Sequence, residues 1–256
     1  MPSTPRQREA LPPAEPAQPA VAAHLLGLVD YDAALALQQR LVYEVGGRAD
    51  GQISLLLCEH PACITVGRQG SRADIRLGPR GLASRRLSVR WVNRGGGALM
   101  HAAGQLAIYP IVPLARRGWS VGEYLDRLQG GVLAALDELH LSCHVRPDAR
   151  GVWGRTGQMA AIGVAVKDWI GYHGAFVHVD TPAELLRLVN SDLVEGRPMT
   201  SLVAERQQPV KMTAVREGLV RHLAAAFDCQ RIHLFTGHVL LAPSVRDAHE
   251  SAARAG

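Results

Sequence analysis

The sequence predicts an α/β fold in which helices pack on one side of a mixed β-sheet. Continuous apolar runs at 53–58 and 106–112 are typical of buried strands, while 31–45 and 213–227 carry helix-spaced apolar stripes. Strands and helices do not alternate strictly, which disfavours a doubly wound parallel sheet. A chain of 256 residues with 47% hydrophobic content suffices for a single core.

The composition narrows the class of protein. No apolar stretch approaches the length that a membrane-spanning helix needs, and the N-terminus lacks a basic segment followed by an apolar one. We therefore expect a cytoplasmic protein without a membrane partner. Aromatic residues make up 5%, and no nucleic-acid-binding module is visible, so we expect no nucleic-acid partner. The cysteines lack metal-ligand spacing and predict reduced thiols without a metal site: Cys58, Cys63, Cys143 and Cys229.

The chain divides into a central domain and two tails. Residues 1–22 are rich in Pro, Ala and Gln, which predicts a disordered N-terminal tail. Residues 23–242 form the predicted domain, and 243–256 form a loose C-terminal tail. No internal repeat is visible.

The first part of the domain predicts a helix followed by two strands. Asp30 is placed to cap a helix over 31–45, and Gly46-Gly47 can end it. The apolar run 53–58 reads as a central strand, and a second strand begins at Ile64 after a turn.

A polar loop over 68–86 opens an arginine-rich stretch that reaches residue 94. Across this stretch Asp74 is the one acidic residue. Two interpretations stay open: a solvated surface, or a docking site that attracts an acidic partner by its charge. The arginines are Arg68, Arg72, Arg76, Arg80, Arg85, Arg86, Arg90 and Arg94.

A glycine-rich turn follows this stretch. The alternation of Leu87, Val89 and Trp91 predicts a strand over 87–92 with one apolar face. Three glycines after Arg94 let the backbone approach a ligand closely, and His101 follows. This turn can line a pocket, although glycine clusters also form tight loops without a binding role.

The second half predicts a long helix and a strand-rich region. Ser120 and Glu123 form a capping box for a helix with Leu128 and Leu136 inward, weakened by Gly130-Gly131. The other predicted segments are paired strands at 152–153 and 159–166, a loop at 168–174, a strand at 175–179, a short helix at 182–188 and a strand at 232–235.

Several short motifs follow one another along the chain in an order that is typical of one protein family. Thr65-Val66-Gly67-Arg68 precedes Arg94-Gly95-Gly96 and His101, and then come Gly104-Gln105-Leu106 and Tyr109-Pro110. Together they resemble the signature of the lipoyl(octanoyl) transferases. That family moves an octanoyl group from acyl carrier protein to a lysine of a lipoate-dependent protein. The resemblance implies the catalytic-domain fold of biotin/lipoate protein ligases over about residues 24–235.

The resemblance also implies partners and a substrate site. The implied donor is octanoyl-acyl carrier protein, and the acceptors are lipoyl domains of 2-oxoacid dehydrogenases and the glycine cleavage H protein. No cofactor is implied, and we expect a monomer. The implied acyl-substrate pocket comprises Arg94, Gly95, Gly96, Gly97, Ala98, Leu99, Met100, His101, Ala102, Ala161, Ile162, Gly163, Gly174, Ala175 and Phe176.

The two catalytic positions implied by the resemblance depart from the family pattern. The family has a lysine in a Gly-x-Lys hairpin, where this chain has Gln158, and a cysteine where this chain has Ser191. A glutamine does not titrate, and a serine hydroxyl needs an adjacent base. His173 and His178 are the nearest candidates in sequence.

Three interpretations of these departures stay open. The chain is an active transferase, a catalytically inactive acyl-binding homologue, or an ATP-dependent lipoate-protein ligase. Gly95 to His101 also resembles the ligase motif, but ligases likewise use the hairpin lysine. Gly104-Gln105-Leu106 and Met199–Leu202 favour the transferase branch.

Overall fold

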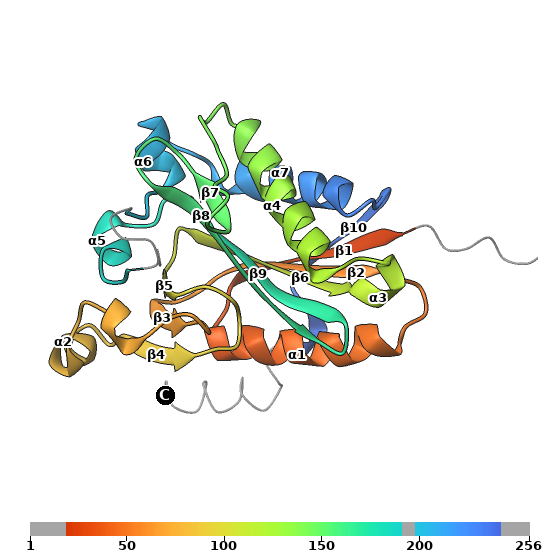
Figure 1. Cartoon of the computed structure of the whole chain (residues 1–256), viewed down its shortest axis with the longest axis horizontal. Helices are drawn as coiled ribbons and strands as arrows, with labels where there is room; N and C mark the ends of the chain where they lie inside the picture. Colours follow the sequence, from red (N-terminus) through yellow and green to blue (C-terminus); the bar gives the residue numbers. More distant parts are fainter. Residues whose placement is uncertain (1–18, 191–197, 242–256) are drawn as a thin grey trace, which may run out of the picture.

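The computed structural model describes residues 19–190 and 198–241, and its centre is a seven-stranded sheet (Figure 1). The strands are β1 (Ala20–Leu28), β2 (Ile53–Glu59), β6 (Gln105–Pro113), β7 (Gly151–Trp153), β8 (Gln158–Lys167), β9 (Ile170–His178) and β10 (Arg231–Thr236). Their order is β10-β1-β2-β6-β9-β8-β7. β1 pairs in parallel with β10 and β2, and the other pairs are antiparallel. The predicted mixed sheet is confirmed.

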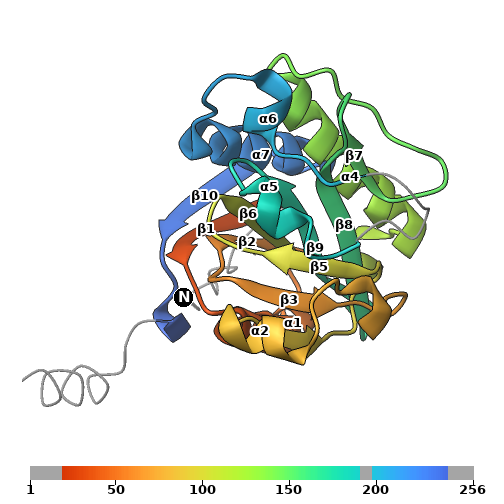
Figure 2. The same cartoon turned by 90° about the vertical axis from the view of Figure 1, so that its left-hand side faces the viewer.

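A smaller sheet lies beside the central one (Figure 2). It contains β3 (Cys63–Val66), β4 (Ser88–Trp91) and β5 (Ala98–His101) in the order β4-β3-β5. The strand predicted around 87–92 exists as β4, but its expected apolar face is only partly buried. Trp91 is 64% exposed, because β4 is an edge strand with one neighbour.

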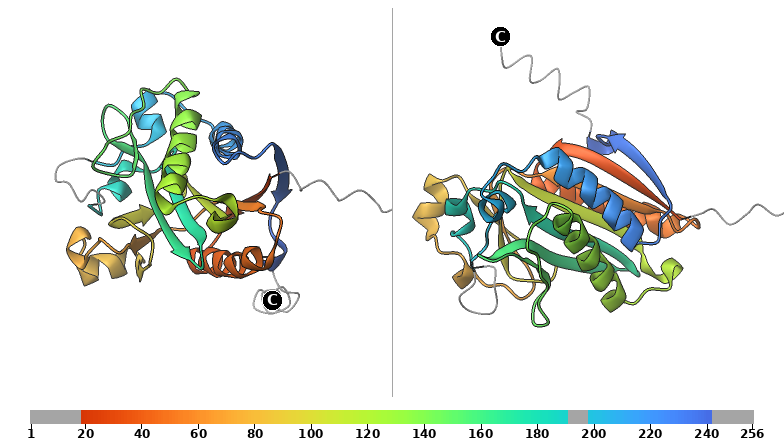
Figure 3. Two further views of the ribbon diagram at one scale, coloured as in Figure 1. Left: turned by 45° about the vertical axis from the view of Figure 1, so that its right-hand side comes forward. Right: turned by 90° about the horizontal axis from the view of Figure 1, so that it is seen from above.

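Long helices cover both faces of the central sheet. α4 (Val121–Asp137) and α7 (Met212–Ala226) share one hydrophobic core with it, while α1 (Tyr31–Gly47) shares the other (Figure 3). The prediction that helices pack on one side is therefore wrong. Side chains alternate between the faces of each strand, and both faces of β2 and β6 are apolar, so each needs a cover.

The remaining helical segments are short. They are α2 (Pro79–Ser84), α3 (Leu114–Arg117), α5 (Ala183–Leu186), α6 (Leu202–Arg206) and the 3₁₀ turns η1 (Arg72–Asp74) and η2 (Val239–Leu241). η1 and α2 divide the segment predicted as one long loop over 68–86. No helix in the described ranges is long and apolar enough to cross a membrane.

The predicted N-caps are confirmed, although Ser120 and Glu123 form only half of the expected capping box, because the Glu123 carboxylate accepts from Arg127. The Asp30 carboxylate accepts hydrogen bonds from the Asp32 and Ala33 amides at 2.9 and 3.2 Å, and Ser120 Oγ accepts one from the Glu123 amide at 3.1 Å. Gly131 has a packing role, because a Cβ there would lie 2.7 Å from Leu223 on α7. A larger residue at this position would require the Leu223 side chain or α7 itself to shift, since the Ala226 Cβ would lie 3.2 Å away.

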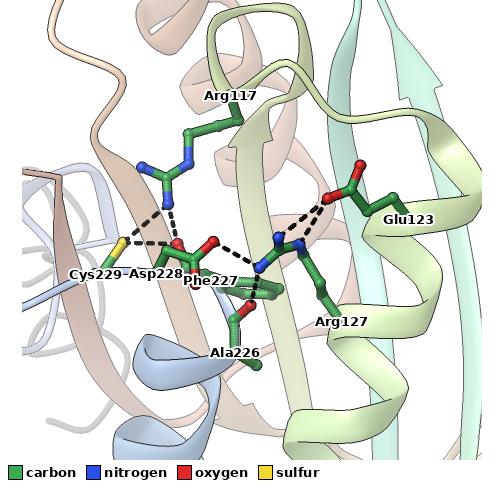
Figure 4. Close-up of polar contacts among 7 residues, drawn as sticks. All are labelled: Arg117, Glu123, Arg127, Ala226, Phe227, Asp228 and Cys229. Atoms are coloured by element: carbon green, nitrogen blue, oxygen red, sulfur yellow. Dashed lines mark hydrogen bonds and ion pairs between the residues drawn. The ribbon is translucent and has the colours of Figure 1, made fainter.

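Polar contacts also link α4 to the end of α7 (Figure 4). The Arg127 guanidinium donates to Glu123 on its own helix, to the Ala226 carbonyl at 2.8 Å and to the Asp228 carboxylate at 2.7 Å. It also lies over the Trp119 ring. These contacts fix the helix pair that covers the sheet opposite α1.

Two predicted boundaries are wrong. Residues 20–22, predicted as disordered tail, begin β1 and are buried between β10 and β2. The alanine-rich run resembles the tail before it, so composition concealed the strand. The loop predicted over 168–174 is confined to a turn at 168–169, and β9 starts at Ile170. The predicted tails otherwise fall largely in 1–18 and 242–256, outside the described residues.

Candidate functional site

A cleft of about 570 Å³ opens beside the glycine-rich loop. This loop, Gly95–Gly97, lines it together with Gln158, Ile162 and Gly163 from β8. Apart from Gln158, these residues come from two of the three segments that the resemblance assigns to one substrate site. The structure brings those two segments to one cleft, and the third, 174–176, is not among the lining residues. The rest of the lining is Arg68, Gln69, Val121, Leu125, Pro147, Asp148, Ala149, Arg150, Val164, Ala165 and Val166.

The glycine loop closes on a free edge of β8. β7 pairs with β8 only as far as Ala161, and the Gly95 amide donates to the Val164 carbonyl beyond it at 2.9 Å. The approach requires glycine at position 163, and the loop conformation favours glycine at position 96. A Cβ on Gly163 would lie 2.4 Å from the Gly95 carbonyl oxygen, and Gly96 has a φ of +83°. The glycines therefore serve loop-to-sheet packing as well as access to the cleft.

A chain of buried polar side chains lies behind the loop. Arg94 Nη2 donates to Thr65 Oγ1 at 2.7 Å, which lies 2.8 Å from His101 Nε2. His101 Nδ1 bonds to Gln105 Oε1 at 2.7 Å, so Nδ1 donates and Nε2 accepts from Thr65. Gln105 Nε2 lies 3.2 Å from His178 Nδ1. The chain ties β3, β5, β6 and β9 together beneath the site.

Arg94 places a positive charge beneath the glycine loop. Its side chain is 1% exposed, and burial lowers its pKa to about 10, so the guanidinium stays charged at neutral pH. It donates to the Gly95 carbonyl at 3.0 Å and lies 5.8 Å from the Phe176 ring centre. A fixed cation in a low-dielectric environment favours negative charge developing nearby, as on the carbonyl oxygen of an acyl group under attack.

The apolar positions of the implied pocket are packed in the cores. Ile162 lines the cleft, whereas Ala98, Leu99, Met100, Ala102, Ala161, Ala175 and Phe176 are buried and divided among three hydrophobic clusters. Neighbours such as Leu99 and Met100 point to opposite faces of a strand. A Cβ on Gly174 would lie 2.1 Å from the Ile108 carbonyl, so this glycine serves strand packing. Substrate contact by these residues stays a prediction.

Gln158 lies at the start of β8, at the edge of the cleft. It is 8% exposed, and its backbone pairs with the segment that returns after residue 197. The Gln158 amide donates to the Pro198 carbonyl at 3.0 Å, and the Thr200 amide donates to the Gln158 carbonyl at 2.9 Å. Ser191 lies outside the described residues. The last described residue before it, Asn190, donates to the Asp74 carbonyl at 2.7 Å.

Glu205, which sequence reasoning missed, holds the turn before Gln158. Its side chain is 3% exposed and accepts from the Arg155 and Thr156 amides at 3.0 and 2.6 Å, and from Thr156 Oγ1. Gly154 leaves room for it, since a Cβ there would lie 2.6 Å from the carboxylate carbon. An acidic residue on the five-residue α6 carries no local signal for a contact 50 positions away.

His173 on β9, near the glycine-rich loop, has unusual hydrogen bonding, backbone conformation and pKa. Asn93 Nδ2 donates to the Tyr172 hydroxyl at 2.5 Å, so Asn93 Oδ1 is the acceptor for His173 Nε2–H at 3.1 Å. Within the described residues its Nδ1 has no partner, and its φ is +55°. Burial, with the charges of Arg94 and Arg68, lowers the pKa of His173 to about 3, so it is neutral at pH 7.

No cysteine of the chain is an activated nucleophile. All four lie in the described part. Burial raises the pKa of Cys63 to about 12 and that of Cys143 to about 11, and it also raises the pKa of Cys58 and Cys229. The two lysines of the chain, Lys167 and Lys211, are exposed and do not line the cleft. No other cysteine and lysine of this chain therefore take the place of the catalytic Cys–Lys pair of the family that the chain resembles. Across 19–190 and 198–241, no His, Cys, Asp and Glu cluster suits a metal ion.

The architecture is that of lipoate protein ligases. A putative lipoate protein ligase from T. acidophilum with bound lipoic acid matches with a TM-score of 0.67 and 14% identity, covering 92% of this chain and 94% of that one. A lipoate-protein ligase A bound with ATP matches with a TM-score of 0.66 and 14% identity, covering 91% and 93%. At this identity the likeness shows the fold, and it confirms the fold implied by the sequence motifs.

Sequence comparison shows the family. The lipoyl protein ligase A/B catalytic domain matches residues 30–224. An octanoyltransferase of Geotalea uraniireducens is 36% identical over 191 residues, covering 75% of this chain and 86% of the relative. An octanoyltransferase of Roseiflexus sp. is 36% identical over 210 residues, covering 80% and 86%. The chain belongs to the lipoyl protein ligase A/B catalytic-domain family, within which these relatives are octanoyltransferases.

Proposed function

We propose that the protein is an octanoyltransferase of protein lipoylation that acts in the cytoplasm. It transfers an octanoyl group from octanoyl-acyl carrier protein to a lysine of a lipoyl domain. The acceptors are the lipoyl domains of 2-oxoacid dehydrogenases and the glycine cleavage H protein. The observation that carries this proposal is the cleft that the Gly95–Gly97 loop and Gln158 share, in a chain whose relatives are octanoyltransferases.

The reaction needs no external energy source. The neutral amine of the acceptor lysine attacks the thioester carbonyl, a C–N bond forms, and the C–S bond breaks. The thiol of the carrier leaves with the proton that the amine loses. Positioning the two substrates and stabilising the oxyanion are then the main tasks of the protein, and Arg94 lies directly behind the loop to favour that charge.

The acyl chain supplies binding energy through its methylene groups. Each buried CH₂ contributes about 0.8 kcal/mol, so an octanoyl tail contributes several kcal/mol before entropic costs. The apolar lining of the cleft at Val121, Leu125, Ile162 and Val164 suits such a tail.

Two routes fit the residues present. In one, Ser191 attacks first and an octanoyl-serine forms before the lysine is acylated. In the other, the acceptor lysine attacks the carrier thioester directly. Direct transfer requires neither a thiolate nor a titrating group at position 158, and it matches the raised pKa values of the cysteines.

The function is tested with purified octanoyl-carrier protein and a lipoyl domain, without ATP. Mass spectrometry should show an octanoylated lipoyl domain that depends on this protein. Octanoyl attached to the transferase itself, and lost in Ser191→Ala, identifies the serine route. Transfer that survives Ser191→Ala without such an adduct identifies direct attack.

Two outcomes would overturn the proposal. Acylation only from free octanoate with ATP would identify a ligase. Binding of the octanoyl carrier without transfer, at any acceptor concentration, would identify an inactive acyl-binding homologue.

A further inference from the structure

A cluster of exposed apolar side chains lies at one end of the central sheet. Six of the eleven exposed large hydrophobic residues in the described ranges belong to β10, to the adjoining η2 or to the end of β1. This concentration distinguishes the cluster from the scattered apolar residues that any surface carries. The six, here called the β10 patch, are Leu28 (64% exposed), Ile232 (43%), Leu234 (61%), Phe235 (46%), Val239 (85%) and Leu240 (52%). The patch occupies both faces of the edge: Ile232 and Leu234 lie on the side that α4 and α7 cover, and Phe235 lies on the α1 side.

The patch coincides with an open sheet edge. β10 pairs with β1 on one side and is the terminal strand of the seven-stranded sheet (Figure 1). All six of its residues are exposed. Beside it, an open groove of about 840 Å³ runs between Leu26, Val29, Phe235 and Leu241. Sheet edges are usually protected by lysine, proline, inward-pointing charge or a covering segment. The sequence Arg231-Ile-His-Leu-Phe-Thr236 contains no lysine, proline or acidic residue.

The segments beyond the described structure lack the composition to cover this patch. Described structure ends at Leu241 beside the groove, and residues 242–256 contain one apolar residue larger than alanine apart from Pro243, which is Val245. Residues 1–18 contain two, Met1 and Leu11. Neither segment matches six large apolar side chains.

We propose that a second copy of the chain pairs with the open edge of β10. The two β10 strands pair antiparallel about a two-fold axis perpendicular to the sheet, and the two sheets join into one. Such an axis keeps each sheet face on its own side, so a residue can oppose itself or a residue an even number of positions away. With the axis at Leu234, Leu234 opposes its own copy, and Ile232 opposes Thr236. His233 then opposes Phe235, an aromatic cross-strand pair.

Charge is consistent with this pairing. The Arg231 side chains of the two copies lie at opposite ends of the paired strands, and no like charges oppose each other. The pairing also satisfies the outward amide and carbonyl groups of β10.

The dimer leaves the catalytic cleft accessible. β1, β2, β6 and β9 lie between β10 and β8, so the interface and the cleft lie towards opposite ends of the sheet. The family match ends at residue 224, before β10. This inference differs from the expectation of a monomer, and it does not depend on the proposed activity.

The oligomeric state tests it. Wild-type full-length protein at micromolar concentration should sediment as a dimer. Leu234→Glu should sediment as a monomer with unchanged far-ultraviolet circular dichroism, because two carboxylates would oppose each other across the axis. The control is Tyr43→Glu, which replaces a side chain that is 77% exposed on α1 and should remain dimeric.

Cross-linking tests the register. Opposed residues on antiparallel strands have Cα atoms about 4.5–5.5 Å apart, which a disulfide can bridge. Leu234→Cys should therefore form a disulfide-linked dimer under mild oxidation, and Tyr43→Cys should not. A wild type that is monomeric throughout a concentration series overturns the proposal. So does a dimer that persists in Leu234→Glu and is not cross-linked in Leu234→Cys.

Discussion

Gly163 lies directly against Gly95: a Cβ on Gly163 would come within 2.4 Å of the Gly95 carbonyl oxygen. The glycine loop can therefore rest on β8 only while position 163 has no side chain. We expect Gly163→Ala to displace the loop and to cost roughly 1–3 kcal/mol of unfolding free energy, as overpacking typically does. Binding of octanoyl-carrier protein, measured by calorimetry, should weaken at least tenfold.

The matched control is Gly130→Ala on the exposed face of α4. A Cβ there meets nothing within 4 Å, so the substitution should stabilise the protein by roughly 0.5–1 kcal/mol through helix propensity. Binding of the carrier should be unchanged. Wild-type affinity in Gly163→Ala would separate the loop contact from substrate binding.

Glu205→Gln tests whether the Glu205 carboxylate positions Gln158 for the reaction in addition to stabilising the fold. The amide replaces one of the two acceptor oxygens that receive the Arg155 and Thr156 amides, so a buried donor is left unpaired, at a cost of about 1–3 kcal/mol. Because this turn leads into Gln158, kcat for octanoyl transfer should fall with little change in KM for the carrier.

A second carboxylate that accepts a hydrogen bond from a backbone amide provides the control for Glu205. Glu59 is partly buried and accepts from the Gly104 amide at 2.9 Å, away from the cleft lining. Glu59→Gln should lower stability while leaving kcat near the wild-type value. Equal effects of the two substitutions on kcat, at equal losses of stability, would mean that Glu205 has no particular role at the site.

The long helices were predictable because their signals are local. The Asp30 and Ser120 caps and the apolar stripes of α1, α4 and α7 stand within one or two turns of each other. The placement of α1 on the opposite face was not predictable, because it depends on which strands pair. The predicted strand at 175–179 missed the first part of β9, which starts at Ile170, for a related reason. His173-Gly174 has the composition of a loop, yet Gly174 is needed where β9 approaches the Ile108 carbonyl.

The candidate site likewise contains some features that the sequence predicts and others that it does not. Ordered motifs identified the glycine loop and the Gln158 hairpin, and the structure brings them to one cleft. The motifs also assigned Leu99, Met100 and Phe176 to the substrate pocket, and that assignment stays a prediction; their burial in the cores was not predictable, because strand alternation and burial are set by packing. The hydrogen bonds of Glu205 join residues that are far apart in sequence, and sequence periodicity does not reveal such contacts.

Buried neutral histidines should make the fold sensitive to acid. The folded-state pKa is about 3 for His173 and about 4 for His178, mainly because both are buried, against 6.5 in an unfolded chain. Between about pH 6.5 and pH 4 the unfolded state therefore binds more protons, and the free energy of unfolding should fall as pH falls. Each histidine contributes a slope of up to about 1.4 kcal/mol per pH unit.

Urea titrations at pH 7.5, 6.5, 5.5 and 4.5 measure this slope. His178→Gln should reduce it even if the variant is less stable at pH 7.5, because one buried titrating group has been removed. At pH 7.5 these histidines are largely neutral in both states, so the wild-type value at this pH provides the internal baseline. A slope that His178→Gln leaves unchanged would assign the acid sensitivity to other groups.

The arginine-rich surface around α2 should control association with an acidic carrier protein. Arg72 is unsuitable for this test, since it donates to the Ile75 and Leu77 carbonyls and shapes its own loop. The double reversal Arg80→Glu and Arg85→Glu changes exposed side chains instead. We expect it to slow association at least tenfold at low salt, because exposed charges act over about 8–10 Å at physiological ionic strength.

Stopped-flow association across a salt series tests this surface. The wild-type rate should fall steeply with salt, and the double reversal should show a shallower dependence. Arg40→Glu on α1 is the control for a change of charge elsewhere, since Arg40 is exposed and pairs with Glu44. Equal rates for wild type and the double reversal at every salt concentration would support the interpretation as a solvated surface.

The two substituted catalytic positions separate an altered enzyme from an inactive homologue. If wild type transfers by direct attack, Ser191→Ala should retain most of the activity, and Gln158→Lys should change it little. If wild type is inactive, Ser191→Cys with Gln158→Lys should restore transfer where either substitution alone does little. A thiolate and the ammonium beside it act as a unit, so their effects should be strongly non-additive.

A quantitative comparison of five proteins decides between these outcomes. Octanoylation of a lipoyl domain is measured for wild type, Ser191→Ala, Ser191→Cys, Gln158→Lys and the Ser191→Cys, Gln158→Lys double variant, with carrier binding measured in parallel as the control for folding. The backbone of Gln158 is held by Pro198 and Thr200, so Gln158→Lys keeps the hairpin that presents it. The serine route predicts instead that Ser191→Ala abolishes transfer and that a histidine such as His173 is equally essential. A double variant that folds, binds the octanoyl carrier and transfers nothing would show that Ser191 does not occupy the family's cysteine position.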